Sequence, residues 1–323
     1  MIDLLLMFLV AVVALLVVGA LLAPVETLGW WAGWFEHGAG LDEAVATVRS
    51  AKAEPPVGVQ RFIVFLCGIS SEGGDALPEE EAGWVALLQV RMPAAVVVDD
   101  VFPYSVRNTP LTGDRPFAGF WRWLESQRDV HPRSHLFKLS SLRNTFEILV
   151  SADSRYGPVY NLGVAKELLL GLMRHGYRVE DGVPVTLIGS SGGGQVAVGA
   201  TQYLARVLRP PIHVVSLAGV VADDPGIDAA GHIDHLYGSK DTTPTRYAAL
   251  FPGRWPFISW SRWNRAVARG AIRVQVIGPM VHSGPGSYFD PEITLSNGVS
   301  YREHTVESVR SAIEAAAASQ PHE

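Results

Sequence analysis

Residues 183–208 have the sequence VPVTLIGSSGGGQVAVGATQYLARVL. The first six residues form a short, continuous apolar run rich in β-branched side chains, which is typical of a strand buried on both faces. The part from 193 onward carries apolar residues at three- and four-residue spacing, which predicts a helix. A glycine-rich turn therefore joins a buried strand directly to a helix.

The turn contains GSSGG at 189–193, a G-x-S-x-G pattern with Ser191 at its centre. A nucleophile on so tight a turn needs strained backbone angles and no bulk beside it, and Gly189 and Gly193 supply both conditions. The backbone N–H of Gly192 opens the helix and would point at developing negative charge. Ser191 is therefore the candidate nucleophile.

Other apolar runs of the same kind occur at residues 61–66, 94–98, 212–217, 233–237 and 272–277. Helical patterns alternate with them, at about 78–91, 136–151, 158–175, 256–269 and 302–318. Strands alternating with helices predict an α/β fold, with a mostly parallel sheet covered by helices on both faces. In such folds ligands bind beyond the carboxyl ends of the strands.

A serine hydroxyl is a weak nucleophile unless an oriented base takes its proton. Asp241 follows the predicted strand at 233–237, and His282 follows the next one at 272–277. Ser191, Asp241 and His282 each lie beyond the end of a successive strand. We therefore expect them to meet at one edge of the sheet.

At these residues the chain resembles the α/β-hydrolase superfamily, over roughly residues 57–318. The resemblance rests on GSSGG at 189–193, YGSKD at 237–241 and VHSG at 281–284. It implies a serine hydrolase acting on an acyl bond, with Ser191 as nucleophile, His282 as general base and acid, and Asp241 as the orienting carboxylate. It also implies an oxyanion hole formed by the N–H groups of Gly192 and Ile69. Many members have a His-Gly pair where this chain has Cys67 and Gly68, so the chain departs from the family pattern at this loop.

Several neighbouring residues offer alternatives. Ser190 shares the turn, but the residue two positions before it is Ile188 and not the glycine that the G-x-S-x-G pattern requires. Asp223 and Asp224 could replace the acid, although they suit the solvated turn before Pro225 better. The remaining candidates fit core or surface roles better: Cys67, His232, His235 and His304.

The glycine turn does not predict a cofactor site. A dinucleotide site requires G-x-G-x-x-G, a pattern absent here, and a phosphate loop requires Gly-Lys where the chain has Gly194-Gln195. No cluster of cysteines and histidines has the spacing of metal ligands. The chain has a single cysteine, which cannot form an internal disulfide. The sequence therefore predicts neither a cofactor nor a metal.

Residues 4–23 form a run of twenty positions without a polar side chain. As a helix this run spans about 30 Å, the thickness of a hydrocarbon core. The preceding residues contain no Lys or Arg, which argues against the alternative of a cleaved signal peptide. Aromatic residues that favour the headgroup zone follow: Trp30, Trp31, Trp34 and Phe35.

We therefore expect residues 1–36 to be a single-pass transmembrane anchor with an interfacial aromatic flank, in contact with the lipid bilayer through residues 4–23. The first basic residue after the span is Arg49, so little positive charge holds the flank in the cytoplasm, which favours an extracytoplasmic domain. Residues 37–323 would form the α/β-hydrolase-like domain.

Two long connections interrupt the alternation. Residues 101–157 predict a cap-like insertion, because loops of this length are usually functional or small subdomains. Residues 242–271 contain three tryptophans, five arginines and no acid. This second stretch could be ordinary core and solvated surface, or it could lie against anionic lipid.

The chain has 323 residues and is 48% apolar, with a net charge of -6. This composition excludes a disordered chain and a collagen-like fibre, and the apolar excess confined to one segment excludes a multi-span membrane protein. The acidic balance gives no indication of nucleic-acid binding. The expected function is a membrane-anchored hydrolase of acyl esters or thioesters, including lipids. The alternatives are an acyltransferase with the same residues and a catalytically silent binding module.

Overall fold

The computed structural model describes residues 57–69, 77–102 and 137–318, together with four helical positions at 7, 10, 14 and 18. Within these ranges the chain forms a six-stranded sheet in the order β2-β1-β3-β4-β5-β6, and every neighbouring pair is parallel. Each strand lies where an apolar run predicts one. The strands are β1 (Arg61–Leu66), β2 (Ala95–Val98), β3 (Val185–Ser190), β4 (His213–Leu217), β5 (His232–Tyr237) and β6 (Ile272–Val276).

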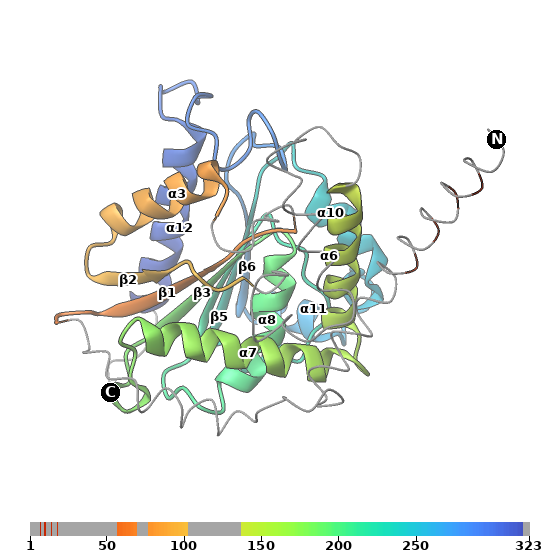
Figure 1. The fold of residues 1–323 in the computed structure, drawn as a ribbon, viewed down its shortest axis with the longest axis horizontal. Helices are drawn as coiled ribbons and strands as arrows, with labels where there is room; N and C mark the ends of the chain where they lie inside the picture. The colour runs from red at the N-terminus through yellow and green to blue at the C-terminus, as the bar shows by residue number, and fades with distance from the viewer. Residues whose placement is uncertain are drawn as a thin grey trace.

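Helices cover both faces of this sheet. Figure 1 shows α3 (Glu79–Arg91) and α12 (Tyr301–Ala318) on one face, with α7 (Gly157–Arg174) and α8 (Gly193–Leu204) on the other. The prediction of an α/β fold with a parallel sheet between two helical layers is confirmed. Within residues 57–69, 77–102 and 137–318, the remaining α-helices are α6 (Phe137–Ala152), α9 (Gly226–Ala229), α10 (Thr243–Leu250) and α11 (Arg262–Ala268).

The alternation of side chains along β1 divides the core into two layers. Phe62, Val64 and Leu66 pack in the layer formed with α7 and α8. Ile63 and Phe65 point to the opposite face and pack in the layer formed with α3 and α12. Because both faces are buried, the central strands carry apolar side chains on both sides, which explains their continuous apolar sequence.

The strand order places a topological switch point between β1 and β3. From β1 the chain continues to β2 on one side, whereas β3 and the later strands lie on the other side. Loops that leave the carboxyl ends of β1 and β3 therefore diverge, and ligands of open α/β sheets bind in the crevice between such loops. Ile69 follows β1 and Ser191 follows β3, so both residues lie at this crevice.

The connection from β5 to β6 differs from the prediction. A helix was expected over residues 256–269, but α11 begins at Arg262, and α10 precedes it without having been predicted. Proline explains the difference, because its ring fixes φ and it lacks an N–H. Pro244 lies in the first turn of α10, Pro252 starts a short 3-10 turn, and Pro256 lies in the loop before α11.

The N-terminal span at 4–23 lies outside the described residues except for its four helical positions, and so does the aromatic flank. No helix in the described ranges is both long enough and apolar enough to cross a bilayer. The anchor therefore stays a prediction. Of the insertion at 101–157, residues 103–136 also lie outside the described part, and α6 packs directly on α7 and α8.

Candidate active site

The turn between β3 and α8 has the strained geometry that the GSSGG pattern predicts. Ser191 has a φ of 51°, in the left-handed region that side chains with a Cβ rarely adopt. A Cβ on Gly189 would lie 2.3 Å from the carbonyl oxygen of Gly193. A Cβ on Gly193 would lie 2.5 Å from the carbonyl oxygen of Leu66. The two glycines are therefore required by close backbone packing around the serine.

The three predicted residues form one chain of hydrogen bonds. Ser191 Oγ lies 2.9 Å from His282 Nε2, and His282 Nδ1 lies 2.9 Å from Asp241 Oδ2. An ionised carboxylate can only accept hydrogen bonds, so Nδ1 carries the proton. Nε2 is then free to accept from the Ser191 hydroxyl. Asp241 is fully buried, whereas the imidazole of His282 remains partly accessible to solvent.

The Asp241 carboxylate is held by more than the histidine. Its Oδ1 accepts from the backbone N–H of Thr243 at 2.9 Å, and its Oδ2 accepts from the Tyr288 hydroxyl at 2.8 Å. Burial alone would raise the pKa of Asp241, but the hydrogen bonds from His282, Thr243 and Tyr288 outweigh burial and hold the pKa below its usual value. Asp241 is therefore ionised at neutral pH.

Tyr288 is a site residue that the sequence did not reveal. Its hydroxyl accepts from the backbone N–H of Gly238 at 2.6 Å while it donates to Asp241. The hydroxyl thus joins the loop after β5 to the loop after β6, which carries His282. Burial raises the pKa of Tyr288, and the neighbouring carboxylate raises it further, so the phenol stays protonated. No motif in the sequence marks this tyrosine.

The loop after β1 lies against the serine, as the resemblance implies for an oxyanion loop. A Cβ on Gly68 would lie 3.1 Å from Ser191 Cβ. The next residue, Ile69, is held by α6, because Asn144 Nδ2 donates to its carbonyl oxygen at 2.9 Å. Asn144 was not predicted as a site residue, although a polar side chain on the inner face of a helix is a recognisable signal.

α6 also covers the start of α8. A Cβ on Gly192 would lie 2.0 Å from Ile148 Cδ1 and 3.0 Å from Ile69 Cγ2. The N–H of Gly192 belongs to the first turn of α8, where backbone donors have no partner within the helix. Gly192 and Ile69, the residues expected to supply the donors, therefore lie in close contact.

The alternative nucleophile and the alternative acids do not take part in the hydrogen bonds between Ser191, His282 and Asp241. Ser190 is buried at the end of β3, and Asp223 Oδ1 accepts from the backbone N–H of Trp263. The expectation that Asp224 is solvated is wrong, because its side chain is buried and bound to Gln195 and to the Gly226 N–H. Burial raises the pKa of Asp224 to about 6.

Two of the alternative histidines and the cysteine contact residues of the protein core or of the neighbouring elements. His235 is buried against Ser216, and burial lowers its pKa to about 3, so it stays neutral. His304 contacts the carbonyl oxygen of Ile277 from the start of α12. Cys67 is buried at the end of β1, as expected of an inert cysteine.

A further buried charge cluster occupies the opposite edge of the sheet, at the starts of β4, β5 and β6. Asp234 Oδ2 lies 2.8 Å from His213 Nε2, and its Oδ1 accepts from Arg273 Nε at 2.6 Å. Burial opposes ionisation of Asp234, but the bonds from these neighbours prevail and lower its pKa. The cluster ties three strands together far from Ser191.

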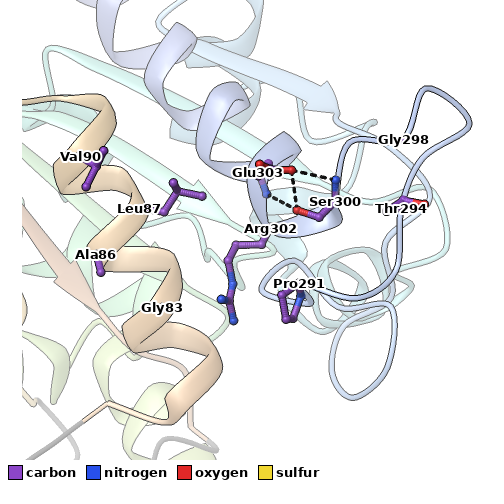
Figure 2. A pocket seen from close by; sticks show the side chains of 10 residues that line it. All are labelled: Gly83, Ala86, Leu87, Val90, Pro291, Thr294, Gly298, Ser300, Arg302 and Glu303. Atoms are coloured by element: carbon purple, nitrogen blue, oxygen red, sulfur yellow. Dashed lines mark hydrogen bonds between the residues drawn. The ribbon is translucent and has the colours of Figure 1, made fainter.

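A cavity of about 590 Å³ lies between α3 and the loop 291–300. Figure 2 shows its lining, with hydrogen bonds between Ser300 and Glu303 at the start of α12. Neither Ser191 nor His282 lines this cavity. Its position beside α3 therefore separates it from the hydrogen-bonded residues described above.

Within the described ranges, no group of three or more histidine, cysteine or acidic side chains is arranged to hold a metal ion. What the described residues of the predicted site share is the chain of hydrogen bonds from Ser191 through His282 to Asp241. No family model matches this chain, and no curated protein matches it in sequence.

Proposed function

We propose that this protein is a serine hydrolase of the α/β-hydrolase type that cleaves acyl esters or thioesters. The observation that carries the proposal is the chain of two 2.9 Å hydrogen bonds from Ser191 through His282 to Asp241. The strained φ of Ser191 supports it, because such strain is typical of a nucleophile presented on a tight turn.

In this mechanism Ser191 Oγ attacks the substrate carbonyl carbon and transfers its proton to His282 Nε2. Asp241 accepts the Nδ1 hydrogen bond throughout and stabilises the imidazolium that forms. His282 then returns the proton to the departing alcohol or thiol, which leaves an acyl group on Ser191. Water, deprotonated by the same nitrogen, attacks this acyl group and releases the acid and the free serine.

The tetrahedral intermediates carry negative charge on the former carbonyl oxygen. The N–H groups of Gly192 and Ile69 are the proposed donors to this oxygen. Loss of one such donor costs about 10²- to 10³-fold in turnover in enzymes of this kind. Asn144 supports the Ile69 donor by holding its carbonyl group from α6.

A fluorophosphonate probe tests the proposal directly, because it forms a covalent bond with an activated serine. We expect the full-length protein to be labelled, the Ser191→Ala variant to lose labelling, and the matched Ser190→Ala variant to retain it. Absence of labelling in folded protein would favour the binding module. Equal labelling of all three proteins would show that another residue reacts.

Turnover of esters distinguishes the remaining candidates. His282→Ala should reduce turnover by about 10³-fold or more. A loss below about tenfold would mean that another group is the base. Transfer of the acyl group to an added alcohol or amine, in preference to water, would favour the acyltransferase.

We further propose that residues 4–23 anchor the enzyme in a membrane, with the catalytic domain on the extracytoplasmic side, where it meets acyl chains of lipids. In the full chain, replacing Leu15 and Leu16 by lysine should release the protein on alkaline extraction. Each lysine costs about 2.5–3.5 kcal/mol at the centre of a span. The matched control is lysine at the exposed Val57. Retention of the double variant in the membrane would overturn the anchor, and activity on short soluble esters alone would overturn the lipid substrate.

A further inference from the structure

The turn after α10 exposes large apolar side chains that the fold does not bury. We call residues 250–260 the aromatic turn. Phe257 and Trp260 are each 70% exposed, Leu250 is 64% exposed and Trp255 is 37% exposed. Trp255 and Phe257 contact each other, with ring centroids 5.5 Å apart. Contiguous apolar groups of this kind on a protein surface mark interaction sites.

The aromatic turn is held rigidly from beneath. Asn264 Nδ2 donates to the carbonyl oxygens of Trp255 and Ile258, and Trp255 Nε1 donates to Ala249. Within the turn, Arg254 stacks on the ring of the buried Trp263 of α11, with its Cζ 3.4 Å from the ring centroid. These contacts hold the backbone of the turn in place, so its aromatic rings are held in their exposed positions.

Two exposed arginines flank this turn, and the acid beside it, Asp223, already accepts from the backbone N–H of Trp263. Arg246 lies one helical turn before Leu250 on α10, and Arg265 lies on α11; both are exposed. Neither forms an ion pair with any residue in the described ranges. Arg262 at the start of α11 and Arg269 directly after its end share one carboxylate at Asp228.

We propose that the aromatic turn and its two unpaired arginines, Arg246 and Arg265, form a docking surface for an anionic lipid membrane. Tryptophan and phenylalanine rings enter the interfacial zone of a bilayer, and arginines beside them bind phosphate headgroups. A lipid surface explains both the apolar and the cationic components of the site. The docking surface is separate from residues 4–23 and does not depend on the proposed hydrolysis.

The aromatic turn lies near the proposed catalytic site, so docking would also bring that site close to the membrane. α10 begins two residues after Asp241, at Thr243, whose N–H donates to the Asp241 carboxylate, and it ends at Leu250. Eight helical residues span about 12 Å, so the aromatic turn lies about that far along the helix from Asp241. Docking through this surface would hold the end of the sheet that carries Ser191 close to the lipid.

A site-specific fluorophore tests the docking. The full-length protein carries an environment-sensitive label on Phe257→Cys, or on Val90→Cys as a matched control. Val90 is apolar, 72% exposed and located on α3. The unmodified chain serves as the blank, since Cys67 is buried. Each protein is mixed with vesicles of phosphatidylcholine, or of phosphatidylcholine and phosphatidylserine, containing brominated acyl chains that quench a label in contact with lipid.

With the anionic vesicles, we expect the fluorescence of the label at position 257 to be quenched and shifted to the blue. The label at position 90 should show no change. Replacing Arg246 and Arg265 by serine should lower the vesicle partition constant about fivefold for each arginine, and salt should also lower it. Equal quenching at both positions, or equal quenching in both kinds of vesicle, would overturn the proposal. A concentration-dependent shift at 257 without vesicles would also overturn it and would indicate a second copy of this chain as the partner. Fluorophosphonate labelling of the same samples reports the proposed hydrolase separately.

Discussion

Replacing Tyr288 by phenylalanine removes one hydroxyl that both donates to Asp241 and accepts from Gly238. A hydrogen bond to a charged acceptor contributes about 1.5–3 kcal/mol, and a buried N–H left without an acceptor costs about 1–3 kcal/mol. Since the ring itself is retained, no large cavity forms. We therefore expect the free energy of unfolding to fall by at least about 2.5 kcal/mol at neutral pH.

The loss should depend on pH in a defined direction. Tyr288 is one of the groups that lower the pKa of Asp241, so the stabilisation is present above the unfolded pKa of about 4 and disappears as the pH falls through the lower folded value. The difference between the two proteins should therefore be largest near pH 7 and smaller in acid. Urea unfolding at several pH values measures it. Turnover should fall about 10- to 100-fold, because a loosened Asp241 orients His282 less well.

Tyr177→Phe is the matched control. Tyr177 is equally buried, but its hydroxyl has no hydrogen-bond partner among the described residues, and burial raises its pKa to about 12. Its removal should leave stability unchanged or slightly increased, with unchanged turnover. Equal losses in the two variants, or a Tyr288→Phe loss that does not vary with pH, would refute the reasoning.

Further substitutions test the surroundings of the site and the opposite edge of the sheet. Gly192→Ala places a Cβ against Ile148 and should cost about 1–3 kcal/mol in thermal unfolding. Adding Ile148→Ala should recover part of that loss, and a purely additive double variant would argue against the contact. Asn144→Ala frees the carbonyl group of Ile69 and should lower kcat about tenfold with little change in KM. Asp234→Asn should cost about 3 kcal/mol in urea unfolding, near the lower limit for a broken buried pair because its arginine partner is partly solvated. It should leave the kcat of folded protein unchanged, since Asp234 lies at the edge opposite Ser191.

The elements predicted well from the sequence are those whose signal is local. Strands buried on both faces require continuous apolar runs, so β1 and β4 could be located without any knowledge of their neighbours. The glycines around Ser191 are equally local, since a backbone that passes within 2.3–2.5 Å of a Cβ position excludes every other residue. The same reasoning failed for α10 and α11, where prolines divide a stretch whose aromatic spacing resembled one helix.

The sequence alone located the parallel α/β pattern, the serine turn, and the order Ser191, Asp241 and His282, because each depends on residue types at the end of a single strand. The tertiary structure was needed for everything formed between elements. It brings Tyr288 to Asp241, Asn144 to Ile69 and the aromatic turn to the surface. Contacts between distant segments depend on how strands are ordered and how helices pack on them, and no local pattern encodes that order.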